Sequence, residues 1–150
     1  MGSISLPISG RIYLDASALI YSIERHPTYA LLLDSIWSAM ASGDAQLLTS
    51  ELTILESLVL PIRGKDQQSL DAFDRVFDES GLQLLPVNRA VLRFASELRA
   101  THTNLRTPDA IHLASAEIYA AQSIITNDKR MGGKTGVVVI VLSDLIQGVS

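Results

Sequence analysis

Apolar positions along the chain alternate between short runs typical of buried strands and longer stretches with the spacing of amphipathic helices. The short runs predict five strands, at residues 11–14, 45–49, 82–87, 123–126 and 136–143. The longer stretches predict six helices, at residues 16–25, 28–43, 50–64, 66–81, 88–102 and 107–116. Strands alternating with helices predict an α/β fold in which helices cover both faces of a mostly parallel sheet.

Capping and helix-breaking residues mark several of the predicted helix ends. Pro27 ends the first helix and Gly43 the second. Ser50 is expected to cap the third helix. Thr107 is expected to cap the sixth, with Pro108 in its first helical position.

Composition favours one compact domain. The chain has 150 residues, of which 47% are hydrophobic and only 19% are charged, so it can bury a sizeable core. No linker, repeat or low-complexity segment divides it. We therefore expect a single domain over residues 1–150, with residues 1–10 forming a flexible N-terminal segment.

Several classes of protein are disfavoured by what the sequence contains. There is no cysteine, which excludes disulfides, thiolate metal sites and a cysteine nucleophile. The longest apolar run, residues 137–142, is far shorter than a membrane span, and the N-terminus lacks the pattern of a signal peptide, so we expect a cytoplasmic protein without a membrane anchor. A net charge of −4 argues against a broad basic surface for nucleic acid, so such a substrate would need a metal or a local group of basic residues.

Two aspartates lie close to the ends of predicted strands. Asp15 directly follows the strand at 11–14, and Asp128 is two residues past the strand at 123–126. In parallel sheets, ligand sites lie beyond the carboxyl ends of the strands. Both residues are therefore candidates for a site, and a turn or cap aspartate is the alternative for each.

Two further acids occur within predicted helices. The helical neighbours of Glu56 are Leu52, Val59 and Leu60, so its carboxylate is expected on an otherwise apolar surface, where an unpaired charge is costly. Asp109 lies in the segment TPDAIHLASA, where complementing the helix dipole is an ordinary alternative role.

Together these four acids predict a divalent-cation site. Few cations are expected inside the fold to pair with them, and clustered carboxylates repel one another unless a cation lies between them. Ligands that are all oxygen favour Mg²⁺ or Mn²⁺. His112, one turn after Asp109, either hydrogen-bonds to a carbonyl or to Asp109 within the core, or contacts substrate.

Four motifs resemble those of the PIN-domain ribonucleases, and within them the VapC-type toxins of toxin–antitoxin pairs. In family order they are LDAS, TSELTILESL, TPDAIHLASA and ITNDKRM, and the resemblance covers residues from about 11 to 143. The resemblance implies a three-layer α/β/α domain and identifies Asp15, Glu56, Asp109 and Asp128 as the acidic, metal-binding site.

The same resemblance implies a Mg²⁺- or Mn²⁺-dependent ribonuclease that leaves 5′ phosphates, and a cognate antitoxin as partner. Ser17, Thr126 and Asn127 are polar candidates beside the acids. Lys129 and Arg130, which stand where many relatives have another acid, are placed to contact RNA phosphates, and solvated surface charge is their alternative.

Two other kinds of function compete with this interpretation. One is a PIN-like binding module that has lost catalysis. The other is a phosphotransfer domain in which Asp15 is phosphorylated; the dehalogenase-like version expects an aspartate at position 17, and a receiver-like version leaves Glu56 unexplained. The segment GGKTG at 132–136 does not fit a nucleotide-binding loop, because a strand rather than a helix follows it.

The second predicted helix suggests self-association. It carries Leu31, Leu32, Leu33 and Trp37, more apolar surface than one core-facing side requires. We therefore expect a homodimer.

Overall fold

Five parallel strands form a single sheet in a computed structural model, which describes residues 5–146. The strands are β1 (Gly10–Leu14), β2 (Ala45–Ser50), β3 (Gln83–Leu85), β4 (Ser123–Thr126) and β5 (Val138–Val141). Their spatial order is β3-β2-β1-β4-β5. The predicted α/β class and parallel sheet are therefore confirmed.

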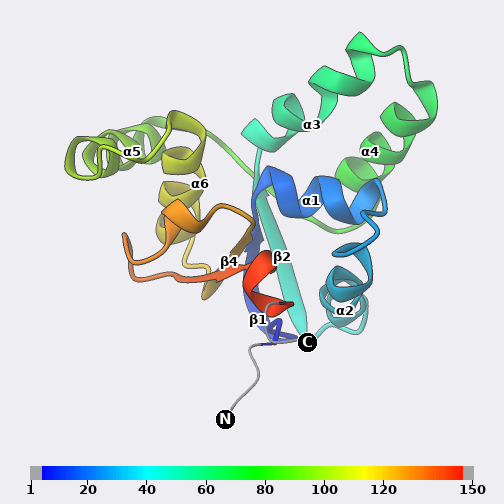
Figure 1. Cartoon of the computed structure of the whole chain (residues 1–150), viewed down its shortest axis with the longest axis horizontal. Coiled ribbons are helices and arrows are strands. Elements are labelled where there is room, and N and C mark those ends of the chain that lie inside the picture. Colours follow the sequence, from blue (N-terminus) through cyan, green and yellow to red (C-terminus); the bar gives the residue numbers. More distant parts are fainter. Residues whose placement is uncertain (1–4, 147–150) are drawn as a thin grey trace.

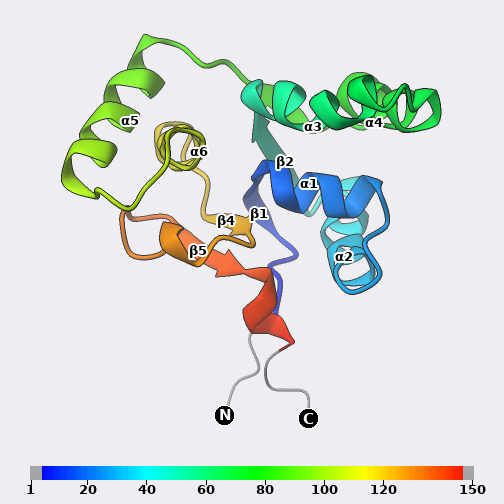
Figure 2. The same cartoon turned by 45° about the horizontal axis from the view of Figure 1, so that its top comes forward.

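Helices cover both faces of this sheet, which gives the three layers (Figures 1 and 2). The helices are α1 (Ala16–Ile23), α2 (Ala30–Ala41), α3 (Leu52–Arg63), α4 (Gln67–Glu79), α5 (Arg89–Thr101) and α6 (Thr107–Ile118). Two 3-10 turns follow, η1 (Lys129–Met131) and η2 (Leu142–Leu145). Helices α5 and α6 lie on one side, and α1 and α2 lie on the other (Figure 1).

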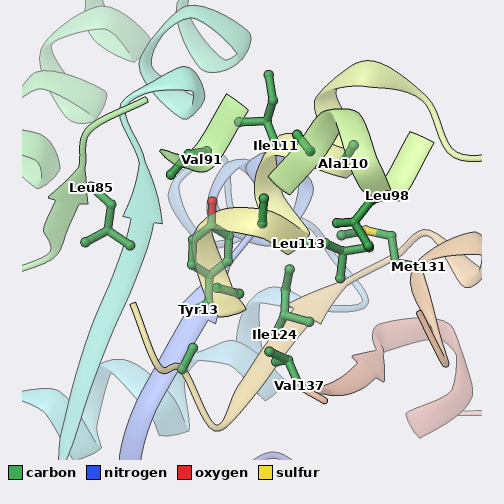
Figure 3. Close-up of a cluster of buried hydrophobic side chains, with 14 of the residues drawn as sticks. Tyr13, Leu85, Val91, Leu98, Ala110, Ile111, Leu113, Ile124, Met131 and Val137 are labelled. Carbon is green, nitrogen blue, oxygen red and sulfur yellow. The ribbon is translucent and has the colours of Figure 1, made fainter. Parts of the chain in front are cut away.

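The central strand β1 faces a different core on each side because successive side chains of a strand point in opposite directions. Ile12 and Leu14 belong to the cluster formed with α1 and α2. Tyr13 belongs to the cluster formed with α5 and α6, and it points toward α6 in Figure 3. All three side chains are fully buried. A polar group on Tyr13 is therefore directed at α6.

Several predicted boundaries were wrong. Strand β3 stops at Leu85, ahead of Pro86, which has no N–H for the ladder. Ser50 is the last residue of β2, and Glu51 is the N-cap of α3. The N-cap of α6 is Arg106 rather than Thr107, whose hydroxyl instead accepts a hydrogen bond from Arg99.

Of the proposed N-terminal segment, residues 1–4 lie outside the described residues. Residues 5–9 have no helix or strand, Leu6 packs against the core, and Gly10 already pairs with Ala45 in the sheet. No helix within the described range is long and apolar enough to cross a membrane.

The strand order places a switch point beside β1. The chain proceeds from β1 to β2 and β3 on one side, then returns to β4 and β5 on the other. The carboxyl ends of β1 and β4 are adjacent, since Leu14 pairs with Ile125. Ligand sites of open parallel sheets lie at such positions.

Candidate active site

A cavity of about 380 Å³ lies at this switch point. Every candidate site residue from the sequence lines it except Thr126, which is fully buried. The lining residues come from the end of β1 and α1, from α3, from the start of α6 with the residue before it, and from the segment after β4. They are Asp15, Ala16, Ser17, Tyr21, Glu56, Arg106, Asp109, His112, Asn127, Asp128, Lys129 and Arg130. The fold therefore brings four acids that are distant in sequence to one cavity.

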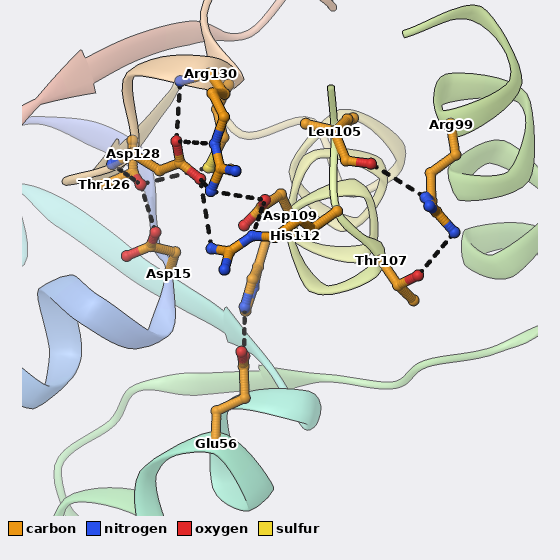
Figure 4. A network of polar contacts seen from close by, with 12 residues as sticks. Asp15, Glu56, Arg99, Leu105, Thr107, Asp109, His112, Thr126, Asp128 and Arg130 are labelled. Carbon is orange, nitrogen blue, oxygen red and sulfur yellow. Dashed lines mark hydrogen bonds and ion pairs between the residues drawn. The ribbon is translucent and has the colours of Figure 1, made fainter. Parts of the chain in front are cut away.

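Asp15 is held rigidly at the junction of β1 and α1. It is the N-cap of α1, and its Oδ1 accepts hydrogen bonds from the Ala18 amide at 3.0 Å and the Ser17 hydroxyl at 2.7 Å. Its Oδ2 accepts from the hydroxyl of Thr126, at the end of β4 (Figure 4). Asp15 therefore caps α1 and also lines the cavity, so both of its predicted roles apply. The hydroxyls of Ser17 and Thr126 orient its carboxylate.

Glu56 is paired with His112, which in turn contacts Tyr13. His112 Nε2 lies 2.7 Å from Glu56 Oε1 (Figure 4), and His112 Nδ1 lies 2.7 Å from the Tyr13 hydroxyl. An ionised carboxylate only accepts, so in the neutral ring Nε2 carries the proton and Nδ1 accepts from Tyr13. Burial raises the pKa of Tyr13 well above its ordinary value, which keeps its hydroxyl protonated.

The expectations for Glu56 and His112 need correction in part. Val59 and Leu60 are 41% and 71% exposed, so the surface around Glu56 is not a buried apolar one. Its side chain is 25% exposed and turns to the cavity. His112 is a buried core histidine, as predicted, but its partners are Tyr13 and Glu56 rather than a carbonyl or Asp109.

Asp109 and Asp128 form the second half of the site. Asp109 is in the first turn of α6 and is 7% exposed, whereas Asp128 follows β4. Burial raises the pKa of Asp109 above its ordinary value, against hydrogen bonding from Arg106. Hydrogen bonding from Arg130 lowers the pKa of Asp128. The expectation that few cations pair with the acids was wrong, because two arginines do so.

Asn127 and Lys129 support the segment after β4. Asn127 Oδ1 accepts a hydrogen bond from the backbone amide of Ser143. Its side-chain nitrogen Nδ2 donates to the Tyr21 hydroxyl at 3.4 Å. Lys129 lines the cavity, yet its ammonium lies 3.6 Å from Asp144. These contacts fix the backbone that carries Asp128.

The donor chemistry of the site fits a hard divalent cation. Four carboxylates converge on one cavity, and oxygen ligands of this kind suit Mg²⁺ or Mn²⁺. Within residues 5–146, no three acidic or histidine side chains stand in ligating arrangement. The residues fit the cation in kind, and each of the four carboxylates already has a partner within the chain.

Sequence reasoning missed Arg106, Tyr13 and Tyr21. Arg106 precedes a predicted helix start, where an arginine is usually a solvated charge, and the available signal was Asp109, three residues later in the sequence. Tyr13 is the one polar aromatic residue in RIYL. Strand alternation places Tyr13 on the face opposite Ile12 and Leu14, and this was the available signal that its hydroxyl points toward the other layer of helices.

Comparison with known families identifies the domain. The family model of the PIN domain matches residues 12–134. A comparison with curated proteins found no significant match.

Solved structures with the same fold include toxin–antitoxin proteins. VapBC2 of Rickettsia felis, bound to a DNA fragment from its promoter, superposes with a TM-score of 0.69 at 14% identity and covers 87% of this chain and 98% of its own. Mycobacterium tuberculosis VapC20, described as a toxin that cleaves the sarcin–ricin loop, superposes with a TM-score of 0.67 at 18% identity. The match covers 85% of this chain and 98% of VapC20. A chain of a Klebsiella pneumoniae toxin–antitoxin complex superposes with a TM-score of 0.61 at 22% identity. The match covers 85% of this chain and 95% of that one.

The hydrogen bond from Tyr13 to His112 generates a testable prediction. Tyr13→Phe leaves His112 Nδ1 buried without a donor, so it should lower the free energy of unfolding by about 1–3 kcal/mol. Tyr119→Phe, which removes only an exposed contact with Asn88, should cost less than about 0.5 kcal/mol. Urea unfolding measures both, and ¹⁵N NMR should show the Nε2–H tautomer of His112 less populated in Tyr13→Phe. Equal unfolding energies in the two variants would contradict the buried contact.

Proposed function

The chain belongs to the PIN-domain family, and we propose that it is a Mg²⁺- or Mn²⁺-dependent endoribonuclease, the toxin of a VapBC-type toxin–antitoxin pair. The observation that carries this proposal is the convergence of Asp15, Glu56, Asp109 and Asp128 on one cavity at the switch point of the sheet. Four acids at such a position suit the binding of a cation together with a phosphodiester.

Within this proposal, the chain's own residues hold the site and the substrate. Asp15 and Asp109 are the first choice as direct ligands, with Glu56 and Asp128 binding directly or through water. When bound, the cation polarises the phosphoryl oxygen and makes an attacking water more acidic. Ser17 and Thr126 fix the orientation of Asp15, and His112 fixes Glu56.

The segment after β4 gives the site its contacts to the nucleic-acid backbone. Lys129 and Arg130 lie at the rim of the cavity with side chains 62% and 42% exposed. Cations at these positions attract phosphates without reading the bases. Asn127 holds the segment in place through Ser143.

One observation favours a second candidate, a PIN-like binding module without catalysis. Arg106 and Arg130 neutralise Asp109 and Asp128, which makes the site stable without any cation. Metal titration discriminates the two functions, because the binding module has no need for a cation.

The first test is loss of metal binding on removal of one charge. Asp15→Asn and Asp109→Asn should each weaken Mn²⁺ binding, measured by calorimetry, by more than about tenfold, since even residues that only orient ligands contribute that much. Asn at position 15 retains the oxygen that caps α1, so the fold should persist. The matched control is Asp144→Asn. Asp144 pairs with Lys129 and does not line the cavity. Degradation of total RNA should require Mn²⁺ and be lost in both site variants; Mn²⁺ affinity equal to that of the control would remove that acid from the site.

A cognate antitoxin is the proposed partner. A planar guanidinium can pair with two carboxylates at once, so an arginine from the antitoxin suits this acidic cavity. Apolar residues of the same tail would lie beside the helices that carry Leu32 and Leu55, of which Leu55 is 63% exposed.

Coexpression tests this partner. We expect expression of this chain alone to arrest growth, coexpression of the small neighbouring gene to restore it, and the two products to copurify. Asp15→Asn should abolish the arrest without the partner, and Asp144→Asn should not. A wild-type chain harmless at high expression would count against the toxin assignment.

We also propose a homodimer, formed through α3 rather than α2. Leu33 is fully buried in the core, so among the apolar residues noted on α2 only Leu31 is strongly exposed, at 76%. On α3, the stripe Leu55, Val59 and Ile62 is 63%, 41% and 59% exposed. Exposed apolar patches of this kind mark interaction surfaces.

Light scattering tests the dimer. Val59→Glu, in the middle of the α3 stripe, should convert a dimer to a monomer, because a charge would be buried without a partner. Leu31→Glu is the control and should leave the mass unchanged. A monomeric wild-type chain, or dissociation by Leu31→Glu alone, would refute the assignment to α3.

A further inference from the structure

Two arginines of the chain, Arg106 and Arg130, each contact both Asp109 and Asp128. Arg130 donates from Nε to Asp128 Oδ1 at 2.9 Å and from Nη2 to Asp128 Oδ2 at 2.8 Å, a two-pronged contact. The same Nη2 lies 3.8 Å from Asp109 Oδ2. Arg130 thus engages both acids at once (Figure 4).

Arg106 makes the reciprocal contacts from the other side of the site. As the N-cap of α6, it donates from Nε to Asp109 Oδ2 at 3.2 Å, and its Nη2 lies 3.8 Å from Asp128 Oδ2. Two guanidiniums and two carboxylates therefore form a neutral set of four charges. Both oxygens of Asp128 are already used as acceptors.

The arginines are the solvent-exposed members of this set, and the acids are the buried ones. The side chains of Asp109 and Asp128 are 10% and 18% exposed, whereas those of Arg106 and Arg130 are 63% and 42% exposed. Ion pairs with an exposed member are weak, because solvent competes for the charge and long side chains lose rotamer freedom. A divalent cation that needs the same oxygens can therefore displace a guanidinium at small cost.

We infer that Arg106 and Arg130 are exchangeable counterions. In the free protein they hold Asp109 and Asp128, a divalent cation displaces them, and the released guanidiniums bind phosphates of the substrate at the rim of the cavity. The planar fork that fits a carboxylate also fits a phosphate. The competition with the cation stands on the ion pairs alone, whereas the phosphate step rests on the proposed function.

Metal titration tests the competition without any RNA. Arg106→Gln and Arg130→Gln should each tighten Mn²⁺ binding by about threefold, and the double variant by about tenfold, the size expected for losing exposed ion pairs. Lys129→Gln is the matched control: it removes the same charge from the same cavity, but its ammonium pairs with Asp144. It should tighten binding by less than about twofold. Arg130→Lys keeps the charge but loses the two-pronged contact. Its Mn²⁺ affinity should lie between those of Lys129→Gln and Arg130→Gln.

Thermal melting gives an independent readout and checks the fold. Without metal, the double variant leaves two acids unpaired and should melt below the wild type; saturating Mn²⁺ should raise its melting temperature more than that of the wild type. The phosphate step is measured by the binding of a phosphorothioate RNA twelve-mer in Mn²⁺. The logarithmic salt slope should fall by about 1.4 in the double variant, since each lost contact to a single strand contributes about 0.7.

The outcomes distinguish failure of this inference from failure of the proposed function. If the double variant binds Mn²⁺ no more tightly than Lys129→Gln while the wild type still degrades RNA, the exchange is refuted and the nuclease stands. If the double variant binds Mn²⁺ and the wild type does not, the exchange is supported, and the arginines outcompete the cation in the wild type. If neither protein binds Mn²⁺, both proposals fail. An unchanged salt slope with tighter Mn²⁺ binding would refute the phosphate step and leave the competition intact.

Discussion

The mutual repulsion of four carboxylates at one end of a parallel sheet is the constraint on which this structure depends. Each acid has its own means of neutralisation. Asp15 accepts from a helix N-terminus and two hydroxyls, and Glu56 accepts from His112. Asp109 and Asp128 share two arginines. Because these partners come from different elements, the folded protein tolerates the cluster without a cation while keeping its acids at the cavity.

Helix α6 links the two halves of the site. It is buried from Asp109 to Ala116, so its acid and its histidine are held by the packing of its whole length. Asp109 in the first turn faces the arginine pair, and His112, one turn later, reaches Glu56 on α3 and Tyr13 on β1. One rigid helix therefore positions groups that contact three other segments, which is the support that precise site geometry needs.

The exposed apolar residues of α3 set this helix apart from the core. Glu56 turns to the cavity from the same helix that exposes Leu55, Val59 and Ile62 to solvent. A partner bound to that stripe would contact a different face of the helix that carries Glu56. Partner binding and site geometry therefore share a structural element, although the site itself is assembled within one chain.

The sequence by itself determined the parallel α/β architecture and the four acids, because hydrophobic periodicity and the positions of acids after strands are local properties of the chain. Only the tertiary structure decided which distant side chains those acids contact. Arg106 lies three residues from Asp109 in sequence but 22 from Asp128, and Tyr13 is 99 residues from His112. The long-range pairings arise from strand order and helix packing, which bring distant side chains together, and no local pattern of residues encodes them. The pairs Arg106–Asp109 and Arg130–Asp128, by contrast, are only three and two residues apart. The prediction of unpaired acids failed because it overlooked these two nearby arginines, which the fold holds between Asp109 and Asp128.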